Sequence, residues 1–235
     1  MSLSRFSSPL MLLCAALTLQ GCAQFLAPQT QFYQLEHGGP ELPKEDKGPA
    51  VLLGPLTLAD YLHRENLVQR ELDESLSISQ QVRWAGSLQD DVGQLMLRQL
   101  AGQLNTSRIA LYPDRVGFDT EVQVLLHISR LDSGAQRPAV LEAQWRLLDG
   151  SGALRGSRLV RLQEEHLGSA AAQVHAQSLL LQRLAAQLTA AINGLPAAEP
   201  VATPKPKPPV PEKRPANGPQ MPVIEPATQM DVFRF

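Results

Sequence analysis

The stretch Val140-Leu141-Glu142-Ala143-Gln144-Trp145-Arg146-Leu147-Leu148 decides the fold of this 235-residue chain. Its apolar and polar residues alternate, which predicts a strand with one buried face and one face in water. Asp149-Gly150-Ser151-Gly152 follows as a hairpin turn signal, and residues 154–164 supply the strand that pairs back. Upstream, residues 121–131 alternate in the same way, with the apolar positions Val122, Val124, Leu126 and Ile128. Together these three segments predict an antiparallel meander.

Two amphipathic helices flank this meander in sequence. The first begins after Ser87, which forms a capping box with Asp90, and Asn105 closes it. The second runs from Ser169 to about Asn193, before the stop signals Gly194 and Pro196. Its apolar stripe consists of Val174, Leu181, Leu184, Leu188 and Ile192.

Further short strands are expected at residues 32–35, 51–56, 67–71, 76–84 and 108–112. Pro55 favours a strand end or a sheet edge for the segment 51–56, because proline donates no ladder hydrogen bond. In residues 76–84, we expect one buried face, made of Leu76, Ile78, Val82 and Trp84. Together, the expected strands and helices predict an α/β fold: a single domain with a mixed, largely antiparallel β-sheet and two main helices packed on it.

The N-terminus has the features of a secretory signal peptide, with Arg5 followed by an apolar run too short to cross a bilayer. Leu19, Gln20, Gly21 and Cys22 resemble the lipobox of bacterial lipoproteins. That resemblance implies cleavage before Cys22 and attachment of acyl chains such as palmitate to this cysteine, which would anchor the protein stably. Ala23 follows, which in such lipoproteins implies release to the outer membrane. The alternative is a signal peptide with an incidental cysteine.

These features divide the chain into a signal peptide at 1–21, a lipidated tether with a short first strand at 22–49, and the domain at 50–195. Eleven of the 19 prolines lie between Pro196 and Pro226, so residues 196–235 are predicted to be a disordered, extended tail. The tail ends on Val232-Phe233-Arg234-Phe235. It is either an extended segment whose tip docks on a partner or a solvated tail without a docking role.

Charge and motif content argue against several functions. Residues 22–195 carry 15 Lys and Arg against 19 Asp and Glu, without the basic excess of a nucleic-acid-binding domain. The five histidines show no metal-ligand spacing, and no nucleophile elbow or phosphate-binding glycine loop is present. We therefore expect no enzyme activity, no metal and no cofactor other than the covalent lipid on Cys22.

Several segments resemble the PqiC-like ABC-type transport auxiliary lipoprotein family. They are Leu53-Gly54-Pro55-Leu56, Tyr61-Leu62-His63-Arg64-Glu65-Asn66-Leu67-Val68-Gln69-Arg70, Arg83-Trp84-Ala85, Phe32-Tyr33-Gln34-Leu35 and Leu141-Glu142-Ala143-Gln144-Trp145. The likeness covers residues 1 to about 195. The chain departs from the family pattern at Glu65, where proline is usual, and at Gly86, where an acid is usual.

The resemblance implies a lipoprotein subunit on the periplasmic face of the outer membrane, in an intermembrane lipid transport system. Its partners would be a PqiB-like MCE protein and further copies of the chain, in a docking or ring-forming scaffold. Tyr61, Arg64, Arg70 and Trp84 are the candidate interface residues, because interface centres favour aromatic and Arg side chains. Trp84 also continues an apolar strand face, which favours a place in the core instead. The alternative function is a carrier that holds a lipid between the sheet and the second helix.

Overall fold

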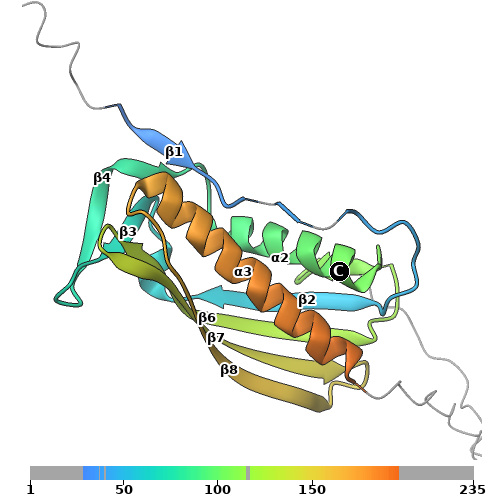
Figure 1. Cartoon of the computed structure of the whole chain (residues 1–235). Helices are drawn as coiled ribbons and strands as arrows, with labels where there is room; N and C mark the ends of the chain where they lie inside the picture. The colour runs from blue at the N-terminus through green and yellow to red at the C-terminus, as the bar shows by residue number, and fades with distance from the viewer. Residues whose placement is uncertain (1–28, 37, 40, 115–116, 196–235) are drawn as a thin grey trace, which may run out of the picture. The chain divides into compact units, whose positions relative to one another are not determined.

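The computed structural model describes residues 29–195, apart from residues 37, 40, 115 and 116. These residues form an eight-stranded open sheet with two long helices in front of it (Figure 1). The predicted α/β fold, with a mixed and largely antiparallel sheet, is confirmed. The predicted signal peptide, Cys22 and the Pro-rich tail lie outside the described residues.

The strands and helices follow the predicted segments, with some shifted ends. The strands are β1 Gln31–Tyr33, β2 Val51–Leu58, β3 Asn66–Arg70, β4 Leu76–Trp84, β5 Ile109–Leu111, β6 Val122–Gly134, β7 Arg137–Asp149 and β8 Leu154–Glu164. The helices are α2 Leu88–Leu104 and α3 Ala170–Asn193, and a short 3₁₀ helix, Asp60–Leu62, links β2 to β3. The sequence pattern did not reveal this 3₁₀ helix.

The predicted meander β6–β7–β8 is the continuous antiparallel part of the sheet. The other edge of β6 pairs in parallel with β2 up to Ile128 and then with β3 at Ser133. β3 is antiparallel to β4, and β1 adds to β4 in parallel. As a result, Gln31–Tyr33 join the sheet beside the end of β4.

Pro55 does not end its strand, contrary to one of the two predictions for it. β2 continues to Leu58, with a shift of register against β6 between Leu53 and Leu56. Because β5 pairs only with Val51–Leu53, Pro55 lies beyond the stretch where β2 has a neighbour on that side. A proline is tolerated at such an irregular and locally open position because it has no N–H to leave unpaired.

The core lies between the sheet and the helices. Val122, Val124, Leu126 and Ile128 of β6 are buried, and so are the predicted apolar residues of β7 and the predicted stripe of α3. Each helix begins as expected: the Ser87 hydroxyl accepts from the Asp90 N–H at 3.3 Å, and the Ser169 hydroxyl accepts from the Ala172 N–H at 3.2 Å. The alternating and helical patterns therefore identified the buried faces correctly.

The prediction for β4 was wrong in its first half. Leu76 and Ile78 are 43% and 40% exposed, while Trp84 at the other end of the strand is buried. The main packing partners of the two helices are each other and strands β2, β5, β6, β7 and β8. Since no helix packs extensively on β4, its apolar alternation does not place Leu76 and Ile78 in the core.

Gly134 allows β6 to pass close to the end of β3. A Cβ built at Gly134 would overlap the carbonyl oxygen of Arg70, which is a backbone atom and cannot move aside cheaply. We predict that Gly134→Ala lowers the free energy of unfolding by about 1–3 kcal/mol, the usual range for overpacking. Urea denaturation checks this, with Gly86→Ala as the control, because a Cβ there meets no atom within 4 Å. Equal midpoints for the two variants would contradict the close approach.

Candidate functional site

The four candidate interface residues lie on β3, on the segment before it and at the end of β4, in two different environments. Tyr61 and Arg70 contact a buried carboxylate, whereas Arg64 and Trp84 line an open pocket. The sequence pattern did not separate these two pairs.

Asp132 of β6 is the carboxylate that binds Tyr61 and Arg70, and its side chain is 0% exposed. The Tyr61 hydroxyl donates to Oδ2 at 2.8 Å. The Arg70 guanidinium donates through Nη2 to Oδ2 at 2.7 Å and through Nε to Oδ1 at 3.1 Å. Arg130 donates from Nε to Oδ1 at 2.9 Å. Three donor side chains therefore converge on one buried anion, which is the arrangement that makes a buried charge tolerable.

These contacts and the burial of the cluster shift the pKa values of Asp132 and Tyr61. Burial alone would raise the pKa of Asp132, but the hydrogen bonds from Arg70 and Tyr61 and the charge of Arg130 leave that pKa below its ordinary value. Burial, followed by the charge of Asp132, raises the pKa of Tyr61 far above its ordinary value. Both shifts favour an ionised Asp132 beside a neutral Tyr61 at neutral pH.

Tyr61 and Arg70 thus have partners inside the domain, and their predicted role as interface residues remains a prediction. The sequence analysis missed Asp132. Its only signal is a carboxylate directly after Leu131, at the end of a long apolar alternation where a charge needs a partner.

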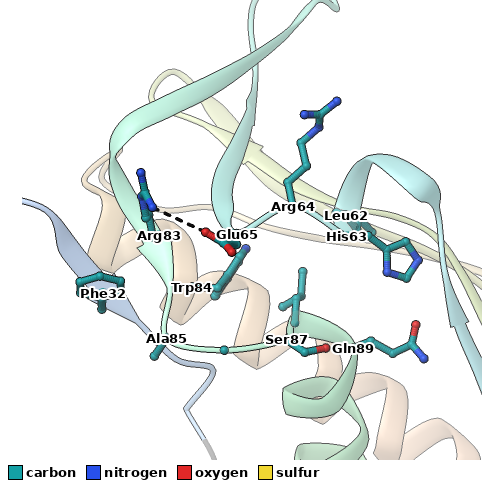
Figure 2. A pocket seen from close by; sticks show the side chains of 12 residues that line it. Phe32, Leu62, His63, Arg64, Glu65, Arg83, Trp84, Ala85, Ser87 and Gln89 are labelled. Atoms are coloured by element: carbon teal, nitrogen blue, oxygen red, sulfur yellow. Dashed lines mark ion pairs between the residues drawn. The ribbon is translucent and has the colours of Figure 1, made fainter.

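The pocket lies between the end of the 3₁₀ helix, the start of β3, the end of β4 and the start of α2 (Figure 2). It has a volume of about 550 Å³ and is open to solvent. Its wall includes Phe32 of β1, Arg64, Glu65, Arg83, Trp84 and Ser87. Phe32 is opposite Arg83 in the β1–β4 register, so the short first strand completes this wall.

Two arginines, Arg64 and Arg83, contribute to the polar part of the pocket wall. Arg83 Nη1 lies 3.5 Å from Oε2 of Glu65, the contact drawn as a dashed line in Figure 2. The Nε atom of Arg83 is buried and has no hydrogen-bond partner in the part of the chain that the structure describes. Arg64 is exposed and, among the same residues, its side chain makes no hydrogen bond or ion pair. The pocket therefore holds cationic donors whose hydrogen bonds are not all satisfied.

Trp84 packs in the hydrophobic core, as the alternative interpretation predicted, and exposes little of its surface. The segment from Trp84 to Leu88 separates the pocket from a second hollow of about 580 Å³, whose wall includes Asp90, Asp91 and Arg98. Trp84 thus supports the walls of both hollows from inside. Its role in contacts with a partner remains a prediction.

The space between the helices and the sheet is filled by side chains. The cavity at Leu62, Leu67, Trp84, Leu131 and Gln177 has a volume of about 10 Å³, which is room for about one water molecule. Buried glutamines occupy the rest of this region: Gln173 Oε1 accepts from Ser133 at 3.0 Å, and Gln177 donates to Ser133 at 3.1 Å. No observation here favours the alternative of a lipid held between the sheet and α3.

Two further features bear on the class of protein. Within residues 29–195, as far as they are described, no group of three His, Cys, Asp or Glu side chains is arranged to hold a metal ion. None of the helices in that part is both long enough and apolar enough to span a bilayer.

The Asp132 contacts give a stability prediction. We expect Asp132→Asn to lower the free energy of unfolding by about 3–5 kcal/mol at pH 7, because it leaves Arg70 and Arg130 without their buried counter-charge. Glu142→Gln is the control, since it breaks an exposed pair with Arg161 and should cost about 0–1 kcal/mol. Equal effects of the two substitutions in urea denaturation would contradict the proposed contribution of Asp132 to the free energy of unfolding.

The same contacts predict a pH dependence. Because the pKa of Asp132 is lower in the folded state than in the unfolded state, its stabilising contribution is present above the unfolded pKa of about 3.9. It is lost as the pH falls through the lower, folded pKa. The stability difference between the wild type and Asp132→Asn should therefore shrink when unfolding is measured below about pH 4.

Similar solved structures confirm the fold. A crystal structure of an uncharacterized protein is 17% identical, with a TM-score of 0.57, and the alignment covers 70% of this chain and 99% of the other. Protein XCC0632 from Xanthomonas campestris, of the DUF330 family, is 14% identical, with a TM-score of 0.55 and coverage of 68% and 93%. No curated protein matches the chain.

The sequence itself matches a family model described as the ABC-type transport auxiliary lipoprotein component, over residues 33–189. That range begins at Tyr33, the last residue of β1, and ends within α3, so it includes strands β2 to β8, the helix α2 and most of α3. A family of this kind comprises accessory proteins of transporters and is not a class of enzymes. The chain belongs to the ABC-type transport auxiliary lipoprotein family.

Proposed function

We propose that the chain is a subunit of a PqiABC/MCE-type intermembrane lipid transport system, anchored on the periplasmic face of the outer membrane. There it acts as a docking or ring-forming scaffold. The match to the family model over residues 33–189 carries this proposal. The filled core and the open, arginine-lined pocket on the surface agree with a protein that binds partners.

The anchor in this proposal is the lipid on Cys22, directed by Leu19, Gln20 and Gly21. β1 begins nine residues after Cys22, and nine extended residues reach at most about 30 Å. Because β1 pairs with β4, this short linker would keep the β1–β4 end of the domain near the membrane. The pocket, whose wall includes Phe32 of β1, would then lie in the same region.

The partners in this proposal are a PqiB-like MCE protein and further copies of the chain. Of the four candidate interface residues, Arg64 has the exposed side chain without a partner in the described domain. Tyr61 and Arg70 would act indirectly, by fixing the loop that carries Arg64. Trp84 would support the pocket wall from the core side.

Affinity capture of the MCE protein tests this proposal. Wild-type full-length chain, extracted from envelopes in mild detergent, should retain the PqiB-like MCE protein of the same cell. Arg64→Glu should reduce the retained amount by on the order of tenfold, because it replaces a free cation at the contact with an anion.

The matched control is Arg158→Glu, since Arg158 is an exposed arginine on β8 that also makes no ion pair among the described residues. It should retain as much MCE protein as the wild type. The proposed function is wrong if the wild-type chain retains no MCE protein under conditions where it remains folded.

A further inference from the structure

The pocket has an excess of positive charge at a place where hydrogen-bond donors remain unsatisfied. Among the residues of its wall, Arg64 and Arg83 are cationic and Glu65 is the one carboxylate. Glu65 approaches only Nη1 of Arg83, at 3.5 Å, which leaves the buried Nε of Arg83 and the whole guanidinium of Arg64 without an acceptor among the described residues. One additional carboxylate would balance the charge and accept hydrogen bonds from the guanidinium of Arg64 and from the exposed part of Arg83, whose side chain is 42% exposed; the buried Nε itself is out of reach of a ligand.

The wall also includes apolar side chains. Phe32 is 64% exposed and belongs to an edge strand directly beside Arg83. Leu62, Ala85 and Leu88 also contribute to the wall. A ligand that fits both parts carries a carboxylate next to an apolar side chain, and arginine with aromatic residues is the usual composition of an interface centre.

We propose that this pocket binds an acidic segment of the protein partner, with one Asp or Glu carboxylate between Arg64 and Arg83 and a neighbouring apolar side chain on Phe32. This inference rests on the proposed function, because it names the chemistry of the partner at the same surface. Figure 2 shows Glu65 between Arg83 and Arg64, with its carboxylate in contact with Arg83.

The surroundings favour a narrow segment over an anionic membrane surface. Asp90 and Asp91 lie in the wall of the adjoining hollow, and Asp60 lies in the 3₁₀ helix before Arg64. A flat bilayer of anionic lipid would meet these carboxylates together with the arginines. A peptide segment that enters the pocket meets mainly Arg64, Arg83 and the apolar wall.

Peptide binding tests the inference. Overlapping 15-residue peptides that cover the PqiB-like MCE protein are labelled with fluorescein and titrated with the full mature chain, followed by anisotropy. The peptides that bind should each contain Asp or Glu next to Leu, Ile, Val or Phe. Arg64→Gln and Arg83→Gln should each lower the affinity for the best-binding peptide by on the order of tenfold, the effect of losing one charge-assisted contact. Arg158→Gln should leave its affinity unchanged.

A double-mutant cycle locates the contact. Replacement of the acidic residue of the peptide by Asn or Gln should weaken binding to the wild type by on the order of tenfold as well. It should cost much less with Arg64→Gln or Arg83→Gln, since the partner of that carboxylate is already lost.

Four results would overturn the inference. The first is equal affinity of the wild type and both pocket variants for the best peptide. The second is a preference for basic or uncharged peptides. The third is Arg64-dependent binding to vesicles of phosphatidylcholine with phosphatidylglycerol in the absence of any peptide binding, which would assign the pocket to a lipid headgroup. Retention of the intact MCE protein by both pocket variants would also reject the inference while the proposed function stands.

Discussion

The carboxylate of Asp132 is the constraint on which this end of the molecule depends. It is fully buried, so it is stable only because Tyr61, Arg70 and Arg130 donate to it from three different segments. Tyr61 belongs to the link between β2 and β3, and Arg70 ends β3. The loop that carries Arg64 and Glu65 lies between these two attachment points. The position of the pocket wall therefore follows from a charge that never reaches the surface.

Local patterns in the sequence predict most of the fold because its elements satisfy local rules. The alternation of Leu141, Ala143, Trp145 and Leu147 marked the buried face of β7, and Ser87 and Ser169 marked the helix starts that the structure shows. Alternation cannot tell whether another layer covers a strand, which is why Leu76 and Ile78 were wrongly assigned to the core. In the same way, the predicted apolar stripe of α3 does not include Gln177, although Gln177 is buried against Ser133.

The site was harder to predict, because its contacts join residues distant in sequence. Tyr61 lies 71 positions from Asp132, and Arg70 lies 62 positions from it, so no spacing rule reveals them as partners. The aromatic and arginine residues chosen from the sequence do lie in one region. The structure divides them by their contacts: Tyr61 and Arg70 donate to Asp132, Trp84 packs in the core, and Arg64 makes no hydrogen bond or ion pair among the described residues. Phe32 lies beside Arg83 in the pocket wall only because β1 pairs with β4.

The central claim is that a lipid on Cys22 holds a scaffold domain without a catalytic role at the outer membrane. Intact-mass measurement of the purified mature chain, combined with separation of inner and outer membranes on a sucrose gradient, tests it most directly. The account predicts a wild-type mass that exceeds the polypeptide from Cys22 by its acyl chains, with the protein in the outer-membrane fraction. Cys22→Ala should lose both the added mass and the membrane association. A Cys22→Ala protein of unchanged added mass that still sediments with the outer membrane would contradict the account.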